Sequence, residues 1–139
     1  MNNGIQAGKL FFEEGIPGFP QLQFFQLKQH EPNSPFYSLD SMEEEQVGFW
    51  LVDPFSFFRE YQFTLSDSAK ASLRIDETST PVGVLNIVTI RSNNQVTVNL
   101  KAPIVLNLAN RMGRQVILND DRYSVRQPLV PVNQQQAGG

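Results

Sequence analysis

The chain has no cysteine and a single histidine, His30, among its 139 residues. Without thiols it can form no disulfide framework, no thiolate nucleophile and no Cys-ligated zinc site. A single imidazole also excludes metal sites that are built on two or more histidines. We therefore expect no metal, no other cofactor and no catalytic activity.

Long apolar runs are also missing. None approaches the roughly 20 residues that span a bilayer, and residues 1–9 lack the basic start and apolar stretch of a secretory signal. No segment matches the glycine-rich loop of a nucleotide-binding protein or the spacing of a calcium loop. These absences favour a cytoplasmic protein that contacts no membrane.

The composition that remains is globular, with 40% hydrophobic and 18% charged residues. A chain of this length suits one domain, which we place at residues 1–129. Residues 130–139, which end in a run rich in glutamine and glycine, are expected to form a disordered tail.

Charged and aromatic residues are unevenly distributed along the chain. Residues 1–69 carry three basic and ten acidic side chains, whereas residues 70–139 carry eight basic and four acidic ones. Fourteen of the fifteen aromatic residues lie between Phe11 and Phe63. Such asymmetry predicts a polarised surface for a charged partner or, if strands from both halves interleave, no net polarity. Most of the aromatics are expected in the core, and an exposed binding patch is the alternative for the remainder.

Short strands are predicted over most of the chain. Alternating, β-branched and apolar runs indicate strands at residues 9–13, 24–28, 36–39, 47–52, 82–90, 96–100, 104–108 and 115–118. Hairpin turns are expected at 93–94 and near 110–113. One helix is predicted over residues 67–75, with Ser66 or Asp67 as its N-cap. The pattern predicts an all-β fold, a small antiparallel barrel with at most one short helix.

Few residues suggest chemistry. His30 lies in a polar, proline-flanked loop, and a hydrolase triad would need a carboxylate to orient it, so a surface histidine without a chemical role is the simpler interpretation. Asp120 and Asp121 are neighbours, which point to opposite faces of a strand, so they suit a turn or an exposed contact better than an acid–base pair.

Oligonucleotide binding is the main alternative to protein binding. Small β-barrels bind oligonucleotides, and four arginines cluster in the sequence: Arg111, Arg114, Arg122 and Arg126. The aromatic residues that would stack on bases, however, lie in the acidic half. A sequence pI near 5.1 also lacks the positive charge that a phosphate-binding protein needs.

Several short segments form an ordered series: Gly15-Ile16-Pro17-Gly18-Phe19, Pro35-Phe36-Tyr37-Ser38-Leu39, Val52-Asp53-Pro54-Phe55, Val84-Leu85-Asn86-Ile87-Val88-Thr89-Ile90, Asn99-Leu100-Lys101-Ala102-Pro103-Ile104, Gln115-Val116-Ile117-Leu118 and Tyr123-Ser124-Val125-Arg126-Gln127-Pro128-Leu129. Across roughly residues 10–129 this series resembles the family of the flagellar assembly factor FliW. The resemblance implies a non-catalytic regulator with two protein partners, flagellin and CsrA. CsrA is a small RNA-binding dimer that represses flagellin translation.

The resemblance also implies how the partners alternate. While flagellin holds the protein, CsrA is free to repress translation; once flagellin is exported, the protein binds CsrA and relieves the repression. The chain itself is expected to bind no nucleic acid. Family members carry an additional strand before the segment that matches residues 10–19, and here only nine weakly structured residues precede it. Either residues 5–9 form a poor edge strand or the start is truncated, so we expect an exposed sheet edge.

Four acidic residues are candidates for the contact with CsrA, whose RNA-binding character implies basic contact residues: Glu43, Glu44, Glu45 and Asp53. For the three glutamates, a solvated loop tip is the simpler alternative. Flagellin recognition is expected to use apolar contacts, and the sequence does not locate them.

Six further candidates are aromatic or basic: Phe55, Phe57, Phe58, Lys101, Arg122 and Tyr123. The three phenylalanines either pack over one end of the barrel or present aromatic contacts. Lys101 precedes Pro103 at a bulge or crossover, where it is exposed as a contact. Arg122 and Tyr123 form either a contact at the rim or a cation–π brace on the barrel.

Overall fold

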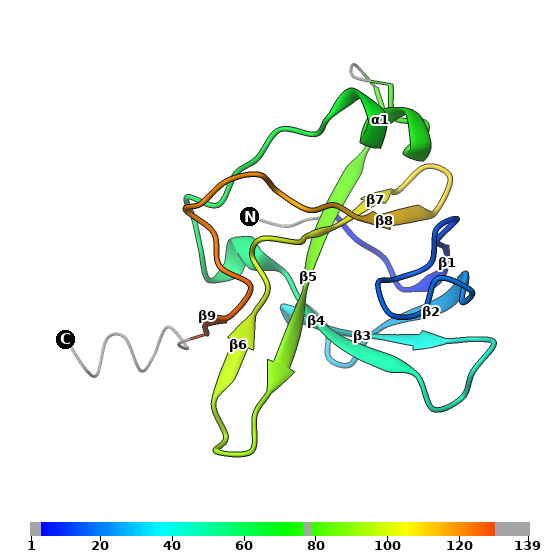
Figure 1. Ribbon diagram of the computed structural model, residues 1–139. Helices are drawn as coiled ribbons and strands as arrows, with labels where there is room; N and C mark the ends of the chain where they lie inside the picture. Colours follow the sequence, from blue (N-terminus) through cyan, green and yellow to red (C-terminus); the bar gives the residue numbers. More distant parts are fainter. Residues whose placement is uncertain (1–3, 77–78, 130–139) are drawn as a thin grey trace.

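The computed structural model describes residues 4–76 and 79–129. In chain order the elements are β1 (Gly8–Phe11), β2 (Phe24–Gln29), β3 (Phe36–Ser41), β4 (Gly48–Val52), the 3-10 turn η1 (Pro54–Ser56), α1 (Asp67–Leu73), β5 (Val82–Ile90), β6 (Val96–Val98), β7 (Ile104–Asn107), β8 (Met112–Gln115) and β9 (Gln127–Pro128). Figure 1 shows β5 as the long strand between the β6 hairpin and the remaining strands.

Seven strands close into a barrel in the order β4-β3-β2-β1-β8-β7-β5, and β5 pairs back to β4. Strands β6 and β9 extend the sheet from β5. The predicted all-β barrel with one short helix is therefore confirmed. One junction differs from the antiparallel expectation, because β1 and β8 run parallel where Phe11 pairs with Met112.

This junction corrects the expectation of an exposed edge at β1. The strand pairs with β2 on one side and with β8 on the other. The preceding residues are also fixed: Ile5 is buried, and the Arg111 guanidinium donates hydrogen bonds to the carbonyls of Gln6 and Lys9 at 3.0 and 3.1 Å. Closure of the barrel thus leaves β1 no unpaired side.

The last predicted strand and turn lie a few residues from their expected places. The turn occupies residues 108–111, because Asn107 Oδ1 accepts hydrogen bonds from the N–H groups of Ala109 and Asn110. Arg111 then adopts a φ of 64°. Strand β8 consequently begins at Met112, three residues before the predicted start, and ends at Gln115. The hairpin at 93–94 is confirmed, with Asn94 at a φ of 66°.

The helix begins as predicted and ends early. Ser66 Oγ accepts a hydrogen bond from the Ala69 N–H at 3.1 Å, which confirms Ser66 as the N-cap. Arg74 is in the left-handed region with a φ of 57°, so it ends the helix at Leu73 rather than at residue 75. Leu73 packs on Val105 and Met112, and α1 therefore covers the outer face of β7 and β8.

Large apolar side chains fill the barrel interior, because residues two apart on a strand point to the same side. The fully buried members of this core are Leu10, Phe12, Ile16, Phe25, Leu27, Leu39, Leu51, Leu85, Ile104 and Leu106. Ile16 enters it from the Gly15-Ile16-Pro17-Gly18-Phe19 turn, where Ile16 and Phe19 form a single β-bridge. The interior is thus a packed core and not a channel.

The two halves of the chain do not interleave in the barrel. Strands β1–β4 are neighbours on one side, and β8, β7 and β5 complete the other side (Figure 1). Residues 4–52 carry two basic and seven acidic side chains. The acidic character of the first half is therefore concentrated on one side of the molecule, which favours the polarised surface over the averaged one.

Candidate protein-binding surfaces

The ten candidate contact residues occupy three separate places. The three glutamates lie in the connection between β3 and β4, and Asp53 lies at one end of the barrel, before η1. The remaining six come from two parts of the chain that the fold brings together outside β5 and β6. They are Phe55, Phe57 and Phe58 after β4, and Lys101, Arg122 and Tyr123 after β6. Each place has a different chemical character.

Of the three glutamates, Glu43 has a structural role. Its Oε1 accepts hydrogen bonds from the N–H groups of Gln23 and Phe24 at 2.6 and 2.8 Å, which ties the β3–β4 connection to β2. These bonds lower the pKa of the Glu43 carboxyl below its usual range. Glu44 and Glu45 are exposed beside it, so two of the three glutamates are available to a partner.

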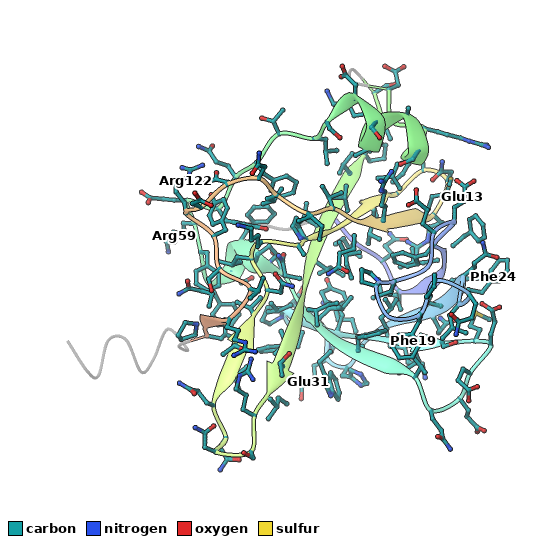
Figure 2. The ribbon with its side chains drawn as sticks, in the orientation of Figure 1. Glu13, Phe19, Phe24, Glu31, Arg59 and Arg122 are labelled. Carbon is teal, nitrogen blue, oxygen red and sulfur yellow. The ribbon has the colours of Figure 1, made fainter. Side chains whose placement is uncertain are left out.

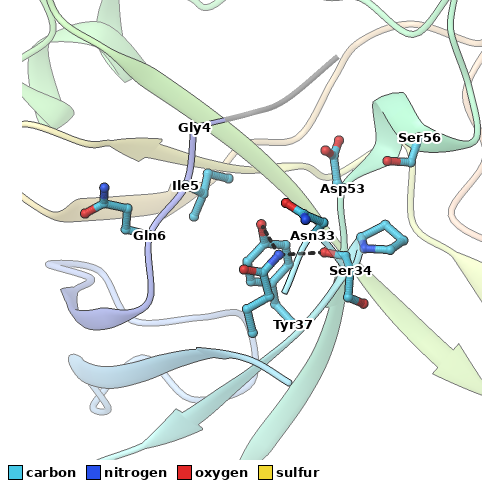
Figure 3. Close-up of a pocket in the computed structure, with 10 residues that line it drawn as sticks. Gly4, Ile5, Gln6, Asn33, Ser34, Tyr37, Asp53 and Ser56 are labelled. Carbon is cyan, nitrogen blue, oxygen red and sulfur yellow. Dashed lines mark hydrogen bonds between the residues drawn. The ribbon is translucent and has the colours of Figure 1, made fainter. Parts of the chain in front are cut away.

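Asp53 is buried and caps η1, where its Oδ1 accepts a hydrogen bond from the Phe55 N–H at 3.0 Å. It lines a polar pocket of about 410 Å³ at the end of the barrel, together with Asn33, Ser34 and Tyr37 (Figure 3). Burial, followed by the charge of Asp53, raises the pKa of the Tyr37 hydroxyl. Asp53 is therefore a buried cap, and unlike Glu44 and Glu45 it does not contribute to an exposed acidic patch.

The aromatic candidates form a second core outside the barrel. Phe55, Phe57 and Phe58 pack on a cluster that includes Val88 and Tyr61, which agrees with packing over the barrel. Tyr61 is the centre of this cluster: its hydroxyl donates to the Leu100 carbonyl at 2.6 Å and accepts from Asn86 Nδ2 at 3.1 Å. Burial raises the pKa of Tyr61 to about 12, so the hydroxyl keeps its proton.

Tyr123 packs against the barrel and carries Arg122 on its ring, an arrangement that corresponds to the cation–π brace, one of the two alternatives given for this pair. Its ring meets Tyr61 edge-on, with centroids 4.9 Å apart, and its hydroxyl donates to the Gln62 carbonyl at 3.0 Å. The Arg122 guanidinium lies 5.2 Å from the Tyr123 ring and also pairs with Asp120 at 2.8 Å. Figure 2 shows Arg122 and Arg59 on the same side of the molecule, where both border one shallow pocket.

Lys101 lies in the crossover between β6 and β7, as predicted for a segment that precedes Pro103. Its ammonium group is 3.7 Å from the Asp121 carboxylate. Asn99 Oδ1 accepts a hydrogen bond from the Ala102 N–H at 3.0 Å and shapes this crossover. Lys101, Arg122 and Tyr123 thus lie near one rim of the barrel, with Lys101 half-buried and Arg122 exposed.

Comparison with known proteins identifies this architecture. Residues 4–129 match the model of the FliW protein family. The flagellar assembly factor FliW of Desulfitobacterium hafniense strain DCB-2 is 44% identical over 126 residues, which cover 90% of this chain and 82% of that protein. That of Clostridium botulinum strain Okra is 36% identical over 121 residues, covering 86% and 84%. A crystal structure of the flagellar assembly factor FliW aligns with a TM-score of 0.80 and 38% identity, covering 89% of this chain and 86% of that one.

The chain belongs to the FliW family. The segments that carry the resemblance have structural roles in the barrel: the turn at 15–19 places Ile16 in the core, and the segment 99–104 forms the crossover into β7. Among the residues that the structure describes, no helix is long and apolar enough to cross a membrane. No group of three or more potential metal ligands occurs in that part of the chain either.

The arginines of this FliW-family chain form no common phosphate-binding surface. Arg111 binds backbone carbonyls near the N-terminus, whereas Arg114 donates to Ser72 Oγ at 2.7 Å and pairs with Glu14 at 3.4 Å. Arg122 pairs with Asp120 instead. Three of the four clustered arginines therefore serve intramolecular contacts at separate places, which weakens the oligonucleotide interpretation.

One exposed feature of the FliW-family barrel was not predicted from the sequence. The outer face of β3 and β4 carries Trp50, which is 49% exposed, beside Ser38, Asp40 and Gly48. His30 belongs to the same place: its Nε2 lies 2.8 Å from Ser38 Oγ, and its ring centroid is 5.3 Å from that of Trp50. The alternation along residues 36–52 could have shown that these side chains share an outer face.

Replacing Tyr61 with phenylalanine is expected to lower the free energy of unfolding by about 1–3 kcal/mol, because the buried Leu100 carbonyl loses its hydroxyl donor. Urea denaturation of both proteins measures this difference. The matched control is Tyr123→Phe, whose hydroxyl bonds Gln62 at an exposed place where water replaces it. Equal losses in the two variants would show that burial of the Tyr61 network is unimportant.

Replacing Glu43 with glutamine is expected to reduce stability more at pH 7 than at pH 3. Because the folded-state pKa of Glu43 is lowered, the stabilisation is fully present above the unfolded-state pKa, near 4.3, and is lost as the pH falls through the lowered value. Denaturation midpoints at the two pH values measure the effect. Glu44→Gln is the control; a loss that is the same at both pH values would contradict the expectation.

Proposed function

We propose that this chain is a non-catalytic regulator of flagellum assembly that binds flagellin and, when released, binds CsrA and relieves repression of flagellin synthesis. The single observation that carries the proposal is the family match over residues 4–129, whose relatives are named flagellar assembly factors. Both partners would be met in the cytoplasm, where flagellin is made and CsrA binds messenger RNA.

The distribution of charge supports CsrA as one partner. The acidic residues of the first half lie on neighbouring strands and their connections, and Glu44 and Glu45 are exposed there. A protein that binds RNA presents basic side chains, and complementary charge both speeds encounter and favours the correct partner. The contact should therefore weaken as salt is added.

The exchange of partners needs no reacting group. When two ligands deplete one pool of protein, the free concentration of that protein decides how much of the second complex forms. Flagellin that accumulates before export would hold the regulator, and its export would release the regulator to CsrA. The requirement is that binding of one partner excludes or weakens binding of the other, through a shared site or through coupling between two sites.

A co-purification and RNA-displacement experiment tests this function. The tagged chain should retain purified CsrA and purified flagellin in separate experiments. Added to CsrA with a labelled flagellin-leader RNA, it should release the RNA, and flagellin added afterwards should restore RNA binding. Binding of neither protein would overturn the proposal, and so would direct, salt-sensitive binding of the labelled RNA by the chain alone.

A further inference from the structure

We propose that a groove over Gly48, on the outer face of β3 and β4, receives a lysine or arginine side chain from a basic segment of CsrA. In this groove the Trp50 ring provides a face for the cation, and the carboxylates of Asp40 and Glu45 provide the opposite charge. The inference rests on the proposed function, since it assigns to one of those two partners a particular place on this chain.

The groove has a volume of about 460 Å³ and is lined by His30, Ser38, Asp40, Trp50 and residues 45–49. Strand pairing fixes its width, because Asp40 lies opposite Gly48 and Ser38 lies opposite Trp50. These positions alternate with the buried Leu39 and Leu51, so their side chains point outward.

Gly48 forms the floor of the groove. Its φ is not positive, so the backbone conformation does not require glycine at this position. A Cβ atom there would lie 2.6 Å from Asp40 Oδ1 and would displace that carboxylate. A glycine within a strand often marks a place where another chain or a ligand approaches closely. A larger residue at position 48 would therefore move the Asp40 carboxylate from its place in the groove.

Trp50 is the only tryptophan of the chain and is 49% exposed. One part of its ring is held by His30, which is in turn fixed by the contact between His30 Nε2 and Ser38 Oγ at 2.8 Å. The indole is thus positioned before any partner binds. The face of an indole attracts a lysine or arginine cation more strongly than that of any other side chain.

The carboxylates of Asp40 and Glu45 make no hydrogen bond or ion pair within residues 4–76 and 79–129. The backbone between the two residues is ordered, since Ser41 Oγ accepts hydrogen bonds from the N–H groups of Glu43 and Glu44. A preordered site loses little entropy when a partner binds. Two carboxylates without partners beside an exposed indole match a cation and repel an acidic segment.

Among the described residues, no lysine or arginine lines the groove. Strands β2, β3 and β4 carry one basic side chain, Lys28, which lies opposite Ser38 on β2 and does not line the groove. Parts of the outer faces of β5 to β8 are covered, by α1 over Val105 and Met112 and by the second core around Tyr61 over Val88 and Val98. The groove therefore combines exposure, an aromatic face and negative charge, and the required partner chemistry is a basic segment.

Calorimetric titration of CsrA into the full chain tests the inference. Asp40→Asn and Glu45→Gln together are expected to weaken CsrA binding about tenfold or more, since each change keeps the shape and removes a charge. Glu13→Gln, which removes an exposed charge from the connection between β1 and β2, outside the groove, should change affinity less than twofold. Gly48→Ala, which fills the floor without any change of charge, should weaken binding as well.

Flagellin binding serves as the folding control, because every variant should retain it. If wild type binds CsrA and the Asp40→Asn, Glu45→Gln double variant binds it equally well, the groove inference fails while the proposed function stands. If Glu13→Gln weakens binding as much as the Asp40→Asn, Glu45→Gln double variant, the effect is one of general charge and the inference is likewise overturned.

A second measurement tests the groove directly if wild type does not bind CsrA, a result that would overturn the CsrA part of the proposed function. Fluorescence of the single tryptophan, Trp50, is followed while a hexa-arginine peptide is added. A saturable change that disappears in the Asp40→Asn, Glu45→Gln double variant and persists in Glu13→Gln supports a cation-binding groove. The absence of a saturable change in wild type would overturn it.

Discussion

Replacing Phe12 with alanine should lower the free energy of unfolding by about 3–5 kcal/mol, a large part of the total stability of a small domain. The side chain is 0% exposed and meets Phe25 edge-on, with ring centroids 5.4 Å apart. It also fills the space beside Gly113, where a Cβ atom would lie 2.6 Å from the ring. Alanine would leave a cavity that rigid strands on both sides cannot close.

Urea denaturation followed by circular dichroism measures this loss, and Phe24→Ala provides the matched control. Phe24 lies on the outer face of β2 and is 36% exposed, with Phe11 and Lys9 on its ring. Its removal should cost about 1 kcal/mol, since less area returns to water and no interior cavity forms. If the two variants lost similar stability, the barrel interior would not be the main core.

Replacing Gly15 with alanine is expected to cost about 3 kcal/mol or more, because two separate penalties act at this residue. Its φ is +68°, a conformation that costs an L-residue about 1–2 kcal/mol. A Cβ atom would also lie 2.5 Å from the Phe19 carbonyl oxygen and 2.7 Å from Pro20 Cα. These are backbone atoms of a tight turn, which cannot move aside without displacing Ile16 from the core.

Gly18→Ala separates the two penalties within the same turn. Gly18 also has a positive φ, of 93°, but a Cβ atom there would meet nothing within 4 Å. Its replacement should therefore lose only the conformational part, about 1–2 kcal/mol. Thermal and urea unfolding of both variants give the comparison. An equal loss at both positions would mean that the close approach to Phe19 and Pro20 has no energetic consequence.

The proposed binding groove is independent of these stability effects. Asp40 and Trp50 lie on the outer side of strands whose inner residues, such as Leu39 and Leu51, form the core, and Glu45 lies in the connection between those strands. Substitutions on the outer side leave the interior contacts in place, so binding and folding can be measured separately. Phe12 and Gly15 act in the opposite way, since their replacement should weaken every partner contact through unfolding.

Local patterns predicted the elements that depend on neighbouring residues. The β-branched run of β5 predicted that strand to the residue, and Asn94 formed the expected hairpin turn. Ser66 capped the helix for the same local reason. The turn after β7 was misplaced, because the side chain of Asn107 bonds the following N–H groups and starts the turn earlier than the Gly113 signal suggested.

For two of the candidate contact residues, local sequence patterns did not predict the structural role. Asp53 and Glu43 looked like free surface charges, but each accepts backbone hydrogen bonds, from Phe55 and from Gln23 and Phe24 respectively. The donors to Glu43 lie about twenty residues away, so no local pattern shows them. For Arg122 and Tyr123 the sequence left a rim contact and a cation–π brace equally open, and the contact of Tyr123 with Tyr61 joins residues too far apart for any local pattern to show.

By itself the sequence determined an all-β chain with no cysteine, one histidine and an acidic, aromatic first half, since composition and alternation depend only on the order of residues. Only the tertiary structure decided that β1 meets β8 and that β4 meets β5, because these pairings join segments far apart in the chain. Closure then placed the acidic half on one side and set Asp40, Gly48 and Trp50 around one groove. Contacts between distant residues depend on how the whole core packs, and that is why local patterns could not predict them.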